Sequence, residues 1–399
     1  MSLNEKIKEL AKKYESYMIA ERHHFHEYPE VGLKEFETSK RLKEACKELG
    51  LPLVEGEGTG FIAIYDTGKP GKTLAIRTDI DALPMKEDPN NLVGPKKVVS
   101  KLDDACHSCG HDAHMAMELA AIKILLDLKD ELSGKILFCF EAAEEFGGGY
   151  EEMAKLLVPL KPDAIYGSHV TAFMKSKTVC LDGGPRMGGS MLIDITVQGK
   201  GGHGSRPDLS INPLFAAAAI VTQLGNNWAN RIDVTKTVTL GIAQLHCGTA
   251  DNIFAETAKI GGTCRFFDME EAEKAAEILR RVPDLVAQAN YCTVSYGPRH
   301  ATPGGPVIND DKLAALARKG AREILGDEGV VEGVLWFASE PFSRYGTLLG
   351  IPSVFAFVGI GNEELGSGAE HHNNRFDIDD DALLSGVLAT CKFATEFLA

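Results

Sequence analysis

The feature that most constrains the fold is a pair of reactive segments that different parts of the chain must bring together. The first, residues 104–114, reads Asp-Ala-Cys-His-Ser-Cys-Gly-His-Asp-Ala-His. The second, Glu-Ala-Ala-Glu-Glu at 141–145, directly follows residues 135–140, which we expect to form a buried apolar strand. Thiolate and imidazole suit zinc-like cations, and a carboxylate beside a metal can act as a general base. The sequence therefore predicts a metal site that only the tertiary fold can assemble.

Helices and strands alternate through the first half of the chain. Strands are expected at 61–65, 73–77, 135–140 and 164–166. Several of them run into polar side chains, including Asp81, Glu144 and His169. Open α/β sheets carry functional residues at the carboxyl ends of their strands. We therefore predict an open, mixed-sheet α/β catalytic domain.

The pattern changes near residue 183 and resumes after Pro298. In between we expect, in chain order, a strand at 192–197, a helix from 213 to about 224, strands at 237–245 and 257–266, a helix from 269 to about 289 and a strand at 294–296. Asn212 and Asp268 are the expected N-caps of the two helices. This β-α-β-β-α-β order predicts a ferredoxin-like α+β domain inserted into the larger α/β domain. The predicted bounds are 1–185 and 300–399 for the larger domain and 186–299 for the inserted one.

Composition excludes several classes of partner. The chain has 399 residues and a formal net charge of −15, so nucleic acid and anionic membranes would be repelled. Nine cysteines without a framework spacing favour reduced thiols over disulfides. The sequence shows no secretory signal and no apolar run of membrane-spanning length. We therefore expect a cytoplasmic protein with a small-molecule substrate.

Six segments in register resemble the M20 metallopeptidases. They are Arg22–Glu30, Arg77–Pro84, Cys109–His114, Glu141–Glu145, Gly199–Gly204 and His372–Asp377. Within that family they look like the amidohydrolase branch, which holds hippurate hydrolases, aminoacylases and auxin-conjugate hydrolases. The resemblance implies a metal-binding α/β domain with a ferredoxin-like lid that forms a homodimer. It also implies hydrolysis of the amide bond of N-acyl amino acids, with a dipeptidase or aminopeptidase, or a catalytically silent binding homologue, as alternatives.

The resemblance further implies a role for each matching residue. Two divalent ions would be held by Cys109, His111, Glu145, His169 and His372. Glu144 would be the general base, and His203, Asn252 and Arg265 would face the substrate. His203 and Asn252 are expected to reach across from a partner subunit. Zn²⁺ is the preferred ion because a single thiolate favours softer metals, while Mn²⁺, Co²⁺ and Ni²⁺ stay open.

Ligating imidazoles need a hydrogen-bond partner, and Asp81 and Asp112 are candidates for that supporting role. His107 and His114 are expected to orient ligands and not to bind metal.

Other interpretations stay open at single positions. Glu144 and Glu145 could be an acidic helix start, Arg265 a charge on a sheet face, and Asn252 a turn stabiliser. The chain also departs from the family pattern. Asn374 stands where proline is usual, and residues 89–101 lack the usual lead-in to the cysteine.

Overall fold

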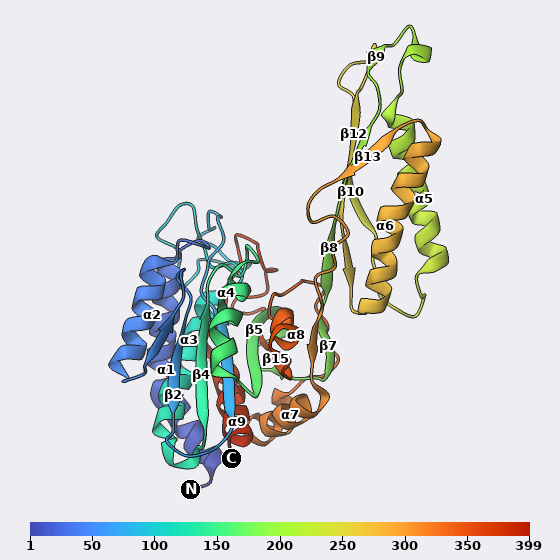
Figure 1. The fold of residues 1–399 in the computed structure, drawn as a ribbon. Coiled ribbons are helices and arrows are strands. Elements are labelled where there is room, and N and C mark those ends of the chain that lie inside the picture. The colour runs from blue at the N-terminus through green and yellow to red at the C-terminus, as the bar shows by residue number, and fades with distance from the viewer. The chain divides into compact units, whose positions relative to one another are not determined.

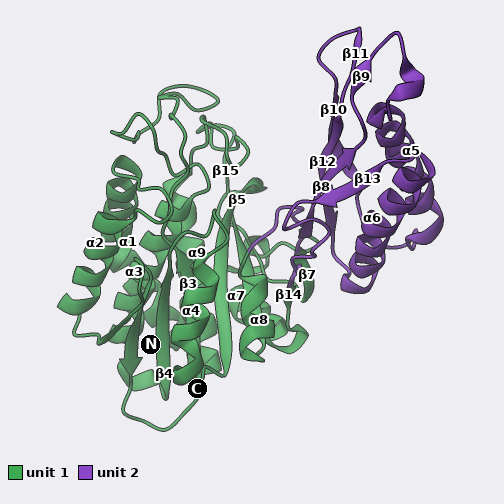
Figure 2. Cartoon of the chain, turned by 45° about the horizontal axis from the view of Figure 1, so that its top comes forward, with its two compact units in different colours: residues 1–186, 308–334, 341–399 green, residues 187–307, 335–340 purple.

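The computed structural model describes residues 1–399 and divides into two compact units (Figure 2). Unit 1 holds residues 1–186, 308–334 and 341–399, and unit 2 holds residues 187–307 and 335–340. The chain leaves unit 1 within β7 (Gly184–Met187) and returns within β14 (Val307–Asn309). The boundary at which the chain returns from unit 2 to unit 1 lies after residue 307, eight residues beyond the predicted boundary after 299.

A mixed seven-stranded sheet forms the centre of unit 1 (Figure 1). Its strands, in spatial order, are β1 (Leu53–Glu55), β2 (Phe61–Asp66), β4 (Lys135–Glu141), β3 (Thr73–Asp79), β5 (Ala164–Lys175), β15 (Ser353–Gly361) and β6 (Val179–Cys180). The four central strands β4, β3, β5 and β15 are parallel, and the outer ones pair antiparallel. Central parallel strands are covered on both faces, which is why β4 is an unbroken apolar run.

Helices cover both faces of this sheet. On one face α1, α3 and α9 contact one another around the main core, and α7 packs on α9. On the other face α4 contacts β2, β4 and α8. These helices are α1 (Leu3–Glu27), α2 (Phe36–Glu48), α3 (His111–Asp127), α4 (Gly149–Leu157), α7 (Asp311–Leu325), α8 (Ser343–Leu349) and α9 (Leu383–Phe397). Short 3₁₀ turns occur at Lys129–Glu131, Val158–Leu160, Asp327–Gly329 and Asp380–Ala382. None of the helices is both long and apolar enough to cross a bilayer.

Unit 2 is a four-stranded antiparallel sheet with two helices. The strands lie in the order β10 (Gly241–Cys247), β12 (Thr257–Phe266), β8 (Gly189–Gln198) and β13 (Thr293–Tyr296). Helices α5 (Pro213–Arg231) and α6 (Met269–Ala289) pack together over a separate apolar core. A ribbon of β9 (Gly202–His203) and β11 (Ile253–Phe254) and a 3₁₀ turn at Pro207–Leu209 complete it. The chain order β-α-β-β-α-β with this strand order is the predicted ferredoxin-like arrangement.

The two predicted N-caps of unit 2 are confirmed, but one helix is longer than expected. Asn212 accepts a hydrogen bond from the Leu214 N–H, and Asp268 accepts one from the Glu271 N–H. Helix α5 does not stop near residue 224 but continues to 231. Leu224 and Trp228, one turn apart on the same helix face, are both buried, and this burial outweighs the weak helix propensity of the intervening glycine.

Candidate metal centre and active site

The candidate ligands of unit 1 converge at the carboxyl edge of the parallel strands. Cys109 and His111 lie at the start of α3, and His169 lies on β5. Their ligand atoms lie within 4.8 Å of one another. The same limit joins three further groups that share members with the first: Cys109, Glu145 and His372; His111, Glu144 and Glu145; and Asp79, His111 and His114. The fold thus brings together all five predicted ligands and the predicted base.

A glycine allows Cys109 and His111 to approach the sheet closely. Gly110 caps α3 with φ +91°, a left-handed conformation that other residues avoid. A Cβ at this position would lie 2.4 Å from Cγ2 of Val170, the residue after His169 on β5. Only glycine therefore lets the start of α3 contact β5, and this contact puts Cys109 Sγ 3.5 Å from His169 Nε2.

Each of these imidazoles turns one ring nitrogen toward the cluster. His111 Nδ1 lies 2.8 Å from the Asp81 carbonyl oxygen and donates to it, which leaves Nε2 facing the cluster. That Nε2 is buried, has no hydrogen-bond partner, and lies 3.8–3.9 Å from carboxylate oxygens of Asp79, Glu144 and Glu145. His169 Nδ1 likewise donates to the Val170 carbonyl oxygen at 2.6 Å. A buried ring nitrogen without a hydrogen-bond partner, surrounded by carboxylates, is unfavourable unless a cation lies between them, so these residues fit a divalent metal.

The ionisation of Cys109 supports the same conclusion. Burial, and next the negative charge of Glu145, raise the pKa of the Cys109 thiol well above its usual value. A neutral thiol binds metal poorly, whereas a bound divalent cation deprotonates a coordinating thiol outright. The Cys109 thiolate and the neighbouring glutamates can therefore all be negatively charged only if bound cations compensate for their charge.

Asp81 fixes the two adjacent glutamates. Its carboxylate oxygens accept the backbone N–H groups of Glu144 and Glu145, each at 3.1 Å. The side chains of the glutamates then approach His111 Nε2 from two positions, Glu144 Oε2 and Glu145 Oε1, both at 3.9 Å. Asp81 thus positions a candidate ligand and the candidate base with one buried carboxylate.

His372 reaches the cluster from the loop after β15. Its backbone adopts φ +62°, and its N–H donates to the Ser108 carbonyl oxygen. Its Nε2 lies 3.2 Å from Glu145 Oε1, while half of its side chain is exposed. The preceding His371 engages both ring nitrogens with the backbone, Nδ1 with Cys109 O and Nε2 with the Ala172 N–H. Of the two adjacent histidines, His372 is therefore the one able to bind an ion.

His114 lies beside the cluster, but its ring nitrogens are already occupied. Nδ1 is bonded to Asp79 at 2.6 Å, and Nε2 accepts the Val170 N–H at 2.9 Å. Arg77 in turn binds both Asp79 and Glu141 through its guanidinium. The sequence analysis did not identify Asp79. Asp79 lies two residues before Asp81 at a strand end, and this spacing, which places two strand side chains on the same side, could have indicated it.

Asp112 has different partners from those expected. Its Oδ2 binds Arg22 Nε at 2.9 Å and His26 Nδ1 at 2.8 Å, and none of its hydrogen bonds reaches His111, His169 or His372. His107 is buried, and this burial lowers its pKa to about 3. Both residues lie under the site among other charged groups and not at the candidate ion positions.

The three substrate residues predicted from the resemblance lie in unit 2. His203 and Asn252 are neighbours, because β9 pairs with β11 and the Gly204 N–H donates to the Asn252 carbonyl. His203 Nδ1 accepts the Ser205 N–H, which leaves the proton on the exposed Nε2. Arg265 lies on β12, paired with Ser190. Its guanidinium is half-buried, with no acidic partner.

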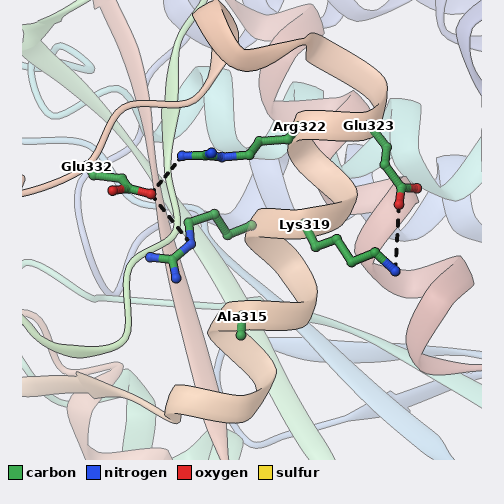
Figure 3. Close-up of a pocket in the computed structure, with 6 residues that line it drawn as sticks. Ala315, Lys319, Arg322, Glu323 and Glu332 are labelled. Carbon is green, nitrogen blue, oxygen red and sulfur yellow. Dashed lines mark hydrogen bonds and ion pairs between the residues drawn. The ribbon is translucent and has the colours of Figure 1, made fainter.

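A surface pocket of about 530 Å³ lies elsewhere in unit 1, along α7 (Figure 3). Arg322 binds Glu332 at 2.7 Å there, and Lys319 lies 3.7 Å from Glu323. Because its cations already face acids, this pocket lacks free charge for an anionic ligand.

Comparison with known proteins gives a consistent result. The model of peptidase family M20/M25/M40 matches residues 75–396. Thermostable carboxypeptidase 1 of Saccharolobus solfataricus is 33% identical, over 100% of this chain and 99% of its own. The N-acyl-L-amino acid amidohydrolase of Geobacillus stearothermophilus is 33% identical, over 82% of this chain and 89% of its own. A dinuclear metal binding peptidase of family M20 from Bacillus subtilis has a similar structure, with a TM-score of 0.80, 27% identity, and 97% and 99% of the two chains covered.

Proposed function

The chain belongs to peptidase family M20/M25/M40, and on that basis we propose that it is a metal-dependent amidohydrolase acting on N-acyl amino acids. The observation that carries this proposal is the cluster of five ligand side chains with Glu144 beside it. A carboxylate that is not needed as a ligand, next to a metal site, is what hydrolysis by an activated water requires.

Two divalent ions fit the ligand set, with Cys109, His111 and Glu145 each shared between groups. We assign Cys109, His111 and His169 to one side of the cluster and Glu145 and His372 to the other. Bound ions would polarise the amide carbonyl and lower the pKa of a water toward neutrality. Zn²⁺ is our preferred ion, because the set combines one thiolate with three imidazoles.

Glu144 is our candidate for the proton carrier. Its backbone is held by Asp81, and its carboxylate lies beside His111 without being required to complete the ligand set. It would take the proton of the attacking water and return it to the nitrogen of the leaving amino acid.

The residues of unit 2 would bind the two ends of the substrate. The half-buried guanidinium of Arg265 has no acidic partner, so it is suited to pair with the free carboxylate of an amino acid. His203 Nε2–H is exposed and points a donor outward, as stabilisation of a developing oxyanion requires.

Geometry within unit 2 favours a homodimer. Gln198 and Thr257 pair at one end of the β8–β12 ladder, near the His203 ribbon, and Arg265 pairs with Ser190 at the other. Eight residues of strand separate these ends by about 26 Å, which a small substrate cannot span. One of the two groups must therefore come from a second copy if both contact one substrate. The exposed edge strand β10 is a surface through which two copies could pair.

The similarity to a carboxypeptidase favours a second candidate activity, the removal of an amino acid from a short peptide. Both activities use the same water and base, and they differ only in whether the acyl group carries an amine. The cytoplasm remains the proposed compartment, supported by nine free cysteines, eight of them buried.

Elemental analysis followed by a hydrolysis panel tests these proposals. The panel would contain N-acetyl and N-benzoyl amino acids beside dipeptides and tripeptides. We expect two ions per chain and faster turnover of N-acyl amino acids. Faster turnover of peptides would favour the second candidate, and two bound ions without turnover would indicate a catalytically silent homologue.

A further inference from the structure

Residues 87–96, here called the clamp segment, pack against the loop that carries His372. The Asp88 N–H donates to the Asn374 carbonyl oxygen at 3.0 Å, and the Arg375 side chain binds Asp88 at 3.2 Å. The Asn91 amide donates to Asp377 at 2.8 Å and to the Leu365 carbonyl at 2.9 Å. The clamp segment therefore contacts the loop on both sides of the candidate ligand.

Lys96 makes the least expected of these contacts. Its side chain is only 1% exposed, and its ammonium lies 2.7 Å from Glu87 Oε1 and 3.1 Å from the Asn374 carbonyl oxygen. Burying an ammonium is costly unless it is fully paired, so an apolar side chain would be the easier way to fill this space. The charge is explained by its two acceptors, one of which is the backbone two residues after His372.

The partner of Lys96 is itself rigidly held. Glu87 accepts hydrogen bonds from His26 at 2.9 Å and from the Ser100 N–H. Burial alone would raise the pKa of Glu87, but the hydrogen bond and charge of His26, followed by Lys96, lower it to about 2. The Lys96 ammonium is thus held by Glu87, which is itself fixed by His26 of α1. The residues that hold Lys96 therefore lie outside the loop that carries His372.

The loop needs such support because His372 is strained and exposed. A residue other than glycine at φ +62° adopts a sparsely populated conformation, which persists only where the surroundings impose it. On its N-terminal side the backbone is fixed by Ser108 and by His371. On its C-terminal side the carbonyl of Asn374, a residue that stands where the family usually has proline, is held by Lys96 and Asp88. The rigidity that a proline ring would supply is here provided by two donors from the clamp segment.

We propose that the clamp segment positions His372 for metal binding and that Lys96 is its principal positioning residue. This inference rests on the proposed function, because it takes His372 as a ligand. Partners that orient metal ligands typically contribute a factor of about 10–100 to metal affinity.

The test measures Zn²⁺ affinity by competition with a chelator and counts bound ions by elemental analysis. We expect two ions in the parent and one in His372→Ala. In Lys96→Met we expect the second ion to bind about 10–100-fold more weakly, with the first unchanged. Lys96→Arg should recover part of this loss. Lys97→Met is the matched control, because that neighbouring lysine is 70% exposed, and it should bind both ions as the parent does.

The outcomes separate the two proposals. Two tightly bound ions in His372→Ala would remove the ligand role of His372 and the inference with it. One ion in His372→Ala, together with parental affinity for both ions in Lys96→Met, would overturn the inference alone.

A second measurement needs no variant. Coupling between two sites is reciprocal, so the second Zn²⁺ must stabilise the clamp segment if the clamp segment favours its binding. Amide hydrogen exchange in residues 87–96 should therefore slow when the second equivalent binds. Exchange that slows only in residues 370–376 would contradict the proposal, even if Lys96→Met failed to fold.

Discussion

Replacement of Asp81 by asparagine tests the internal support of the site. The Asp81 side chain is buried, and its two oxygens accept the N–H groups of Glu144 and Glu145 at 3.1 Å each. Asparagine keeps the shape but turns an amide NH₂ toward one of these donors. The change removes one charge-assisted hydrogen bond and leaves a buried N–H unpaired, which costs about 2–4 kcal/mol of unfolding free energy. Glu144 and Glu145 are expected to move together as a result.

The effect on function follows from that displacement. His111 donates to the Asp81 carbonyl oxygen, which the substitution leaves in place, so the change acts mainly on the glutamates, although His111 Nδ1 also loses the carboxylate charge that lies 3.3 Å away. Misplacing a catalytic group by about 1 Å can lower turnover about 100-fold. We therefore expect Asp81→Asn to lose about 100-fold in kcat at saturating Zn²⁺, and about 10–100-fold in affinity for the ion bound by Glu145.

Three measurements check this prediction. Urea denaturation of the metal-free protein gives the unfolding free energy, chelator competition gives the Zn²⁺ affinity, and hydrolysis of an N-acyl amino acid gives kcat. Asp103→Asn is the control, since that side chain is 92% exposed and should change stability by less than about 0.5 kcal/mol. Parental stability and parental kcat in Asp81→Asn would refute the assignment of Asp81 as the support of both glutamates.

Four further predictions follow from the same contacts. Glu144→Gln should keep both metal ions but lose about 100- to 10,000-fold in turnover, and activity within about tenfold of the parent would remove Glu144 as the base. Cys109→Ser should lower Zn²⁺ occupancy and shift preference toward harder ions, as elemental analysis after dialysis against Zn²⁺ or Mn²⁺ can show. His203→Ala should lower kcat about 100- to 1,000-fold without altering metal content. If His203 comes from the partner subunit, mixing the His203→Ala chain with the Glu144→Gln chain should restore activity. Inactive heterodimers would contradict a site shared between subunits. Burial raises the pKa of Glu118 to about 8 from its ordinary value of about 4.5. Between these two pH values the folded protein holds a proton that the unfolded chain releases, so the unfolding free energy falls as pH rises through that window. Glu118→Gln should flatten this pH dependence, and identical slopes of Tm against pH in parent and variant would count against a neutral Glu118.

Much of the fold could be predicted from the sequence because local patterns determine it, whereas the full candidate ligand set was inferred from the resemblance to a family. The apolar run before Glu141 and the polar residues that follow predicted a strand end at the site. The alternation of unit 2, with Asn212 and Asp268 as N-caps, predicted its ferredoxin-like order. Periodicity and capping act over a few residues, so a single sequence carries them in full.

The resemblance selected candidate ligands among the clustered histidines, but only the tertiary structure gave the physical reason for that selection. His111 and His114 share one face of α3, but the protein occupies both nitrogens of His114 and leaves Nε2 of His111 free. His371 and His372 are adjacent in sequence, yet only the second is free of backbone partners at both ring nitrogens. These differences depend on atoms contributed by β3, β5 and the Cys109 turn, which no local pattern records.

The same limit applies to Lys96 and Arg265. In the sequence, Lys96 and Lys97 are indistinguishable, but one is buried against the loop of His372 and the other is exposed. Arg265 and His203 were both predicted to contact the substrate, with His203 reaching across from a partner subunit. Arg265 lies near the Ser190 end of the β8–β12 ladder, whereas His203 lies on β9, which follows the opposite end of β8. The sequence determined which chemical groups this protein has, since residue types and short-range periodicity are local. The tertiary structure decided which of these groups share a site, because burial and hydrogen-bond partners are set by segments far apart in the chain.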